Sequence, residues 1–175
     1  MRSSVIVDRR WAVHGLVAAL ALFALMAPVA VSGREKPDDR AVAEIERTTL
    51  EAINNERRAM GLPPLELSPE LCRLARAFSR DMVERRFFDH VDPDGQHVHE
   101  RTDRAGIKRW LSVGENIARN RGFKDPVATA VRDWMKSDGH RDNILDETYT
   151  ETGVGVWIAP DRTVYITQIF LRPKR

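Results

Sequence analysis

Apolar residues recur every three or four positions in three stretches of the chain, a spacing that predicts amphipathic helices. The first helix is expected over about 40–60. The second begins at Ser68-Pro69, where serine caps the helix and proline takes the first helical position, and it runs to about Arg86. Asp125-Pro126 repeats this start for a third helix that ends near Ser137. The chain up to this point is therefore predicted to be mainly helical.

The C-terminal part of the chain has a different pattern. Residues 152–159 and 163–171 are rich in β-branched and aromatic residues and predict two strands, which residues 160–162 join as a hairpin. Between the second and third helices lie a turn at 92–95 and a short helix over 99–105. Helices followed by an antiparallel hairpin predict an α+β or three-layer α-β-α domain.

The N-terminus has the features of an export segment. Three arginines precede residues 15–31, an uncharged apolar run (GLVAALALFALMAPVAV), and small residues follow it. This arrangement is typical of a secretory signal peptide over 1–33. An N-terminal membrane anchor is the alternative, because the run is intermediate in length. Residues 34–40 are charged and predict a flexible linker, which leaves 41–175 as a secreted or otherwise extracytoplasmic domain.

The charge and the cysteine content of the chain exclude some classes of function. The chain holds 28 basic and 26 acidic residues. Three of the basic residues and one of the acidic residues lie within 1–33, so residues 34–175 carry 25 basic and 25 acidic side chains. A neutral domain lacks the basic surface of a nucleic-acid-binding protein, which excludes that class. The single cysteine, Cys72, rules out an intramolecular disulfide. Its place in an apolar helix predicts a small buried side chain rather than a nucleophile.

Candidate chemistry centres on three residues. His90, in FFDHVDPDG, follows a helix and precedes a turn, and His140, in WMKSDGHRDNIL, is predicted in a loop just past a helix end. Glu115, in the segment Gly-Glu-Asn-Ile, can accept a proton, bind a metal or orient an imidazole. Each residue also has a purely structural interpretation, and the sequence alone does not bring the three together.

A second pair of histidines stands in the segment His-Val-His-Glu, at His97 and His99. This is not the His-Glu-x-x-His zinc helix, whose spacing places two imidazoles on one face. In an extended segment the two rings would point the same way and could ligate a metal, whereas in a helix they would diverge. A surface pair without a special role is the preferred interpretation.

Four segments in fixed order resemble the CAP superfamily, the cysteine-rich secretory, antigen 5 and pathogenesis-related proteins, also called the SCP family. The resemblance covers about 41–170 and is closest to the bacterial branch without disulfides. It implies a three-layer α-β-α sandwich with a central antiparallel sheet and a large open cleft. The segments are NNERRAMGLPPLELSPEL, FFDHVDPDG, GENIA, and WMKSDGHRDNIL followed by TETGVGVWI, and YITQIF resembles the last strand of the family.

The resemblance also implies which residues line the cleft, which in the family holds two histidines and two acidic residues. His90 matches the first histidine, Glu115 the glutamate of Gly-Glu-Asn, and His140 the second histidine. The fourth residue, a glutamate a few places after the helix tryptophan, does not carry over. Ser137 stands there, and Asp138 beside it is the nearest substitute.

Two imidazoles and a carboxylate suit a divalent metal such as zinc, and with one firm acid the ion is expected to be labile. The preferred hypothesis is an exported, monomeric binding module whose cleft holds that ion and an extracellular or envelope ligand (a lipid, peptidoglycan or a protein). One alternative is a metal-assisted, protease-like hydrolase with Glu115 and His140 as catalytic candidates. The other is a structural cleft with no bound metal.

Overall fold

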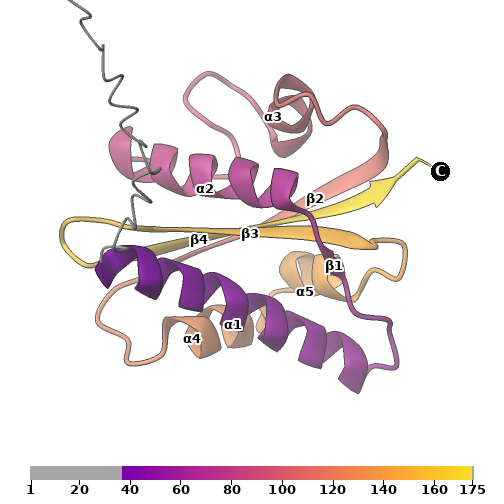
Figure 1. Cartoon of the computed structure of the whole chain (residues 1–175), viewed down its shortest axis with the longest axis horizontal. Helices are drawn as coiled ribbons and strands as arrows, with labels where there is room; N and C mark the ends of the chain where they lie inside the picture. Colours follow the sequence, from indigo (N-terminus) through magenta and orange to yellow (C-terminus); the bar gives the residue numbers. More distant parts are fainter. Residues whose placement is uncertain (1–36, 175) are drawn as a thin grey trace, which may run out of the picture. The chain divides into compact units, whose positions relative to one another are not determined.

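The computed structural model of the protein describes residues 37–174. Within these residues the chain forms three layers (Figure 1). Helices α2 and α3 cover one face of a central sheet, and α1, α4 and α5 cover the other. In chain order the elements are α1 (Pro37–Ala59), β1 (Glu66–Leu67), α2 (Pro69–Glu84), α3 (Val98–Arg104), β2 (Trp110–Asn120), α4 (Pro126–Lys136), α5 (Asp138–Leu145), β3 (Glu151–Ile158) and β4 (Val164–Pro173).

The sheet has the strand order β1-β3-β4-β2. Its three long strands run antiparallel, with Gly114 of β2 opposite Phe170 of β4 and Gly155 of β3 opposite Thr167. The predicted α+β, three-layer fold and the hairpin of β3 and β4 are confirmed. The sheet is mixed rather than purely antiparallel, because the two-residue strand β1 pairs parallel with β3. No tight turn joins these two strands, so nothing forces them to run in opposite directions.

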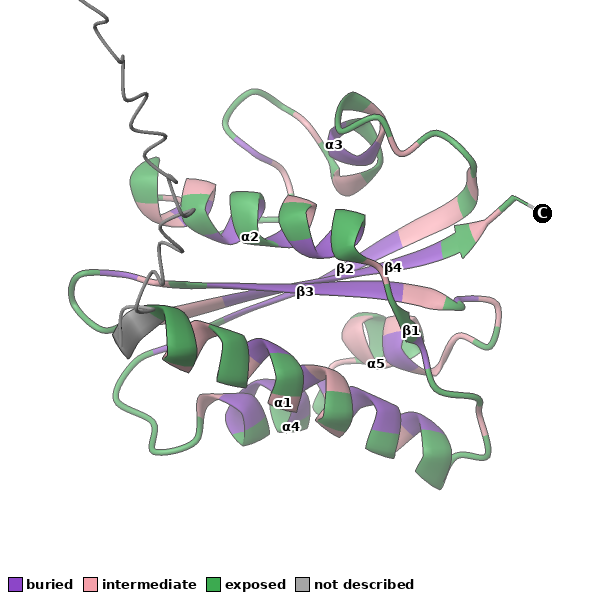
Figure 2. Cartoon of the chain, in the orientation of Figure 1, coloured by how far each residue is buried: buried purple, intermediate pink, exposed green. Residues whose placement is uncertain are grey.

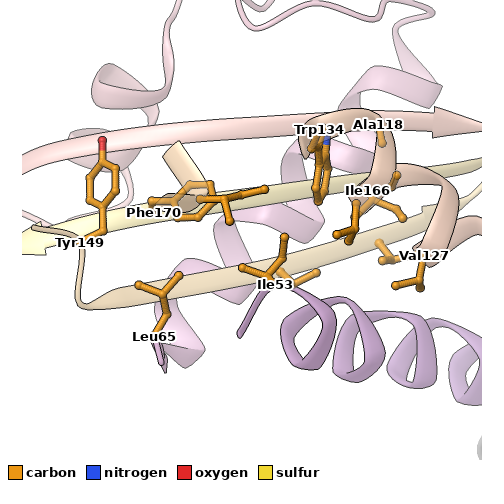
Figure 3. Packing of buried hydrophobic residues seen from close by; sticks show 13 residues of the cluster. Ile53, Leu65, Ala118, Val127, Trp134, Tyr149, Ile166 and Phe170 are labelled. Carbon is orange, nitrogen blue, oxygen red and sulfur yellow. The ribbon is translucent and has the colours of Figure 1, made fainter. Parts of the chain in front are cut away.

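The largest part of the core lies between the sheet and the layer of α1, α4 and α5. Figure 3 shows part of this cluster, in which Ile53 of α1 and Trp134 of α4 pack with Ile166 and Phe170 of β4. These four side chains are at most 2% exposed. Figure 2 shows that α1 and α4 bury the face turned to the sheet and expose the other, as an amphipathic helix does.

On the opposite face, α2 packs directly on the backbone of β3. A Cβ atom at Gly153 would lie 2.2 Å from the carbonyl carbon of Leu71, and one at Gly155 would lie 2.0 Å from the backbone nitrogen of Arg76. Only glycine allows two backbones to approach so closely. The Gly-Val-Gly segment of β3 therefore sets the distance between α2 and the sheet.

An ion pair between the two helix layers covers the outer edge of β3. Past its short pairing with β1, the N–H of Val156 donates to Oε1 of Glu46 on α1 at 3.1 Å. Both Glu46 oxygens also accept from Arg76 of α2, each at 2.6 Å. An exposed strand edge is a template for unwanted pairing with other chains. The Glu46–Arg76 pair closes this edge and ties α1 to α2.

Arg57 of α1 anchors α5 at the C-terminal end of that helix. Its side chain is fully buried, and Nη1 donates to the backbone oxygens of Ile144 at 2.8 Å and Asp146 at 2.9 Å. A cation at this end of a helix complements the helix dipole. The placement of α5, which carries His140, is therefore fixed by a contact at the end remote from the histidine.

Two predicted boundaries are corrected by the structure. Helix α1 begins at Pro37, so the last four residues of the linker expected over 34–40 are helical. Proline at the first helical position and acidic residues in the first turn favour a helix start there. The residues after Ser137 form α5 rather than a loop. The signal peptide or membrane anchor expected over 1–33 lies outside the described residues. No helix within 37–174 combines the length and apolar character needed to cross a bilayer.

The close contact of α2 with β3 predicts that Gly155→Ala destabilises the protein by at least about 2 kcal/mol, because the new methyl group overlaps backbone rather than a movable side chain. Urea denaturation followed by circular dichroism measures the change. Gly139→Ala is the control, since a Cβ there meets no atom within 4 Å. Equal stability of the two variants would contradict this view of the glycines.

Candidate functional site

Strand β2 forms the second edge of the sheet, and the candidate site lies at this edge. The segment after α2 brings His90 to it from one helix layer, and the first turn of α5 brings His140 from the other. The centroids of the two imidazole rings are 5.8 Å apart, and their planes are tilted by 38°. Because the sheet separates the layers elsewhere, side chains of opposite layers meet here past its edge.

Glu115 of β2 holds the ring of His90. Its side chain is 2% exposed, and its Oε1 lies 3.0 Å from Nδ1 of His90. Its other oxygen, Oε2, accepts from Nη2 of Arg101 on α3 at 2.5 Å, and Arg101 is itself buried. Both carboxylate oxygens of Glu115 are therefore engaged. Since Nδ1 of His90 faces Glu115, Nε2 is the nitrogen of this ring that is left for another partner.

Asn116 is directed to the opposite face of the sheet, as successive residues of a strand are. Its Nδ2 donates to the backbone oxygen of His140 at 3.1 Å, and its Oδ1 accepts from Nδ2 of Asn143 on α5 at 3.0 Å. The same Asn143 nitrogen lies 3.2 Å from the backbone oxygen of Glu115. The two asparagines fasten α5, and with it His140, to the edge of β2.

The two remaining residues of the Gly-Glu-Asn-Ile segment also have structural tasks. A Cβ atom at Gly114 would lie 2.7 Å from Oδ1 of Asn143 and 2.7 Å from the hydroxyl oxygen of Tyr149. The backbone oxygen of Ile117 accepts from Nε1 of Trp134 on α4 at 2.9 Å. Each position of this segment therefore contributes to closing the edge of the sheet or to placing a histidine.

The environment of His140 favours its neutral form. Partial burial lowers the pKa of the His140 ring, and the neighbouring His90 lowers it further. A neutral imidazole has a free lone pair, which is the form that binds a metal ion or accepts a proton.

Residues 50–170 match the family model described as CAP, the cysteine-rich secretory protein family. The match spans more than half of the chain and includes His90, Glu115 and His140. The chain belongs to the CAP family. The resemblance inferred from the sequence motifs is thereby confirmed, and the single cysteine of the chain agrees with the bacterial branch without disulfides.

This chain is similar to parts of several longer bacterial proteins. The uncharacterized protein YkwD of Bacillus subtilis (strain 168) is 39% identical over 115 residues, which cover 66% of this chain and 43% of that protein. The uncharacterized membrane protein YlbC of the same strain is 34% identical over 148 residues, which cover 85% of this chain and 40% of that protein. The crystal structure of an extracellular protein containing an SCP domain from Bacillus anthracis str. Ames is similar with a TM-score of 0.67 and 29% identity, covering 81% of this chain and 45% of that one. This chain thus spans less than half the length of each of these relatives.

The structure brings the three candidate residues of the CAP domain together, but two of them lie on elements that the sequence did not predict. Glu115 lies on strand β2, where the sequence pattern predicts no helix or strand, and His140 lies in the first turn of α5 rather than in a loop. The centre of β2 carries buried polar residues, so it lacks the alternation of apolar and polar residues typical of a strand. Gly139 suggested a loop, although a glycine in a first helical turn leaves the helix intact.

Asp138, the predicted substitute for the fourth cleft residue, faces solvent and pairs with Arg141. Its side chain is 87% exposed, and its Oδ1 accepts from Arg141 at 2.9 Å. Within residues 37–174 no group of three His, Cys, Asp or Glu side chains is arranged to hold a metal ion. The histidine pair of this CAP domain therefore has one acidic neighbour, Glu115.

The other titratable groups considered from the sequence lie apart from this constellation. His97 is the extended N-cap residue of α3 and His99 follows in its first turn, so that their rings stack with centroids 5.6 Å apart. Both histidines are exposed. Cys72 lies buried on α2, and this burial raises the pKa of its thiol. The prediction that Cys72 is a small buried residue is confirmed.

Two residues that touch the site are not singled out by sequence motifs. Arg101 lies on a short helix rich in charge, where an arginine is usually solvated. Only its tertiary contacts with Glu115 and the ring of Phe78 distinguish it. Asn143 lies within the segment HRDNIL, but an amide carries no chemistry that would mark it before its partners on β2 are known.

The lowered pKa of His140 predicts a loss of stability in mild acid. Folding favours the neutral ring, so this contribution is complete above the ordinary value of 6.5 and is lost as the pH falls below it. Urea unfolding at about pH 7.5 and about pH 5.5 measures the change. His140→Gln should reduce the dependence on pH, whereas His99→Gln, at an exposed position, should retain it. An unchanged pH dependence in His140→Gln would contradict the assignment.

Proposed function

We propose that this CAP domain acts outside the cytoplasm as a binding module, and that a labile divalent ion such as zinc binds between His90 and His140. The observation that carries the proposal is the approach of the two imidazole rings, with centroids 5.8 Å apart, at an edge of the sheet. The side chain of His90 is 47% exposed, so solvent reaches the pair. Imidazole nitrogen is a common zinc ligand in proteins.

The available donors fit a weakly held ion. His90 offers Nε2, because Nδ1 contacts Glu115, and His140 offers a ring that favours the neutral form. Glu115 serves as the partner that orients His90 rather than as a ligand, since both its oxygens are already bonded. Two imidazoles, with water completing the coordination, fall short of the four protein ligands of a structural zinc site. The ion is therefore expected to exchange readily, and the fold does not depend on it.

A bound ion would add a positive charge to the cleft, which suits an anionic or carbonyl group of an extracellular or envelope ligand. Lipids, peptidoglycan and protein partners all carry such groups. The expected export segment over 1–33 supports action outside the cytoplasm. So does the similarity to the Bacillus anthracis protein, which is described as extracellular.

A metal-assisted hydrolase receives less support than a binding module. A general base needs a carboxylate that can take a proton from an attacking water. Glu115 is 2% exposed, and its two oxygens are bonded to His90 and Arg101. Its geometry is that of a residue that orients an imidazole, as carboxylates bonded to metal-binding histidines do.

Zinc binding can be tested by calorimetric titration of the purified domain. The wild type is expected to take up one zinc ion, and His90→Ala and His140→Ala should each abolish uptake at micromolar protein, because each removes one of two ligands. His99→Ala removes an exposed histidine outside the cleft and should bind as the wild type does. Unchanged uptake by the double variant His90→Ala/His140→Ala would refute the site.

The hydrolase alternative predicts turnover that depends on Glu115. Because Glu115 is buried and bonded on both sides, we expect no cleavage of a peptide library or of envelope glycans above that of Glu115→Gln, with or without zinc. Mass spectrometry of the reaction products measures this cleavage. Products formed by the wild type and absent with Glu115→Gln would favour catalysis over binding.

A further inference from the structure

We infer that Arg101 is the positioning residue of the site, and that it decides which nitrogen His90 presents to the cleft. The consequence for zinc rests on the function proposed above, whereas the consequence for the histidine ring does not. The evidence is a set of contacts through which one buried guanidinium holds both ends of the same histidine.

Arg101 reaches His90 by two routes. Its Nη1 donates to the backbone oxygen of His90 at 3.0 Å, which fixes the position of the His90 backbone. Its Nη2 donates to Oε2 of Glu115 at 2.5 Å, and Oε1 of the same carboxylate lies 3.0 Å from Nδ1 of the His90 ring. The guanidinium of Arg101 therefore holds the backbone of His90 directly and the ring of His90 through Glu115.

The guanidinium itself has little freedom to move. Its central carbon lies 3.6 Å from the ring centroid of Phe78, which is 3% exposed, so one face of the guanidinium is covered. A third acceptor, the backbone oxygen of Gln96, lies 2.7 Å from Nη1. The Arg101 side chain is 7% exposed. A planar group with its acceptors fixed and its face covered holds Glu115 in one orientation.

This arrangement determines where the proton of the neutral His90 ring lies. Glu115 faces a permanently charged guanidinium, and an ionised carboxylate only accepts hydrogen bonds. Nδ1 of His90 must then donate to it, which leaves the lone pair on Nε2 directed away from Glu115. If Glu115 were free to rotate, the ring would populate both tautomers, and the cleft would present a donor part of the time.

Lysine is not an adequate replacement at position 101. The backbone oxygens of His90 and Gln96 and the carboxylate of Glu115 are served by two nitrogens of one flat group. An ammonium keeps the charge but places its donors on a single atom and does not stack flat on Phe78. Arg101→Lys therefore separates the charge of Arg101 from its geometry.

The test is nitrogen-15 NMR of the histidine rings in the metal-free protein at about pH 8, where free imidazole is neutral. Wild-type His90 is expected to carry its proton on Nδ1, and Arg101→Lys should shift it toward a mixture of tautomers. Arg104→Lys, at an exposed position of the same helix, is the control and should match the wild type. Zinc affinity should fall about tenfold or more in Arg101→Lys and stay unchanged in Arg104→Lys.

The outcomes separate the two proposals. A proton on Nε2 of His90 in the wild type overturns the inference without any variant, and so does an unchanged Nδ1 proton in a folded Arg101→Lys protein. If the wild type shows the Nδ1 tautomer and loses it in the variant, but takes up no zinc, the positioning role stands and the proposed function fails.

Discussion

Edge strand β2 directs two successive polar residues, Glu115 and Asn116, to opposite faces of the sheet, and the whole site depends on this alternation. Glu115 contacts the ring of His90 on one side, and Asn116 contacts the backbone of His140 on the other. A sheet normally keeps its two helix layers apart. At an edge strand the layers meet, so residues fifty positions apart in the chain come within reach of one another.

A buried carboxylate is bonded to an arginine at the edge of β3 and again at the edge of β2, but with different consequences. At β3, Glu46 accepts from Arg76 and from a backbone N–H of the strand, so both oxygens serve the fold. At β2, Glu115 accepts from Arg101 and uses its second oxygen to hold an imidazole. The difference lies in one partner, because a histidine in place of a backbone amide leaves a second ring nitrogen available. An edge that stabilises the fold can therefore also carry a solvent-exposed imidazole.

The main hydrophobic core of this domain is separate from the histidine pair. The contact of α2 with the Gly-Val-Gly segment is made between backbones, and the cluster around Ile53 and Phe170 does not include either histidine. The partly exposed rings of His90 and His140 contribute little to the core. The main hydrophobic core of the domain therefore forms without these imidazoles.

The sequence by itself determined the helices with clear caps, the C-terminal hairpin and, through its ordered motifs, the CAP family with His90, Glu115 and His140. These features depend on local periodicity, capping or motif spacing. Only the tertiary structure decided that Glu115 lies on a strand, that Asp138 faces solvent, and that Arg101 holds the site. Burial of a polar residue and the identity of its partner depend on chain segments distant in sequence, and no local pattern encodes them.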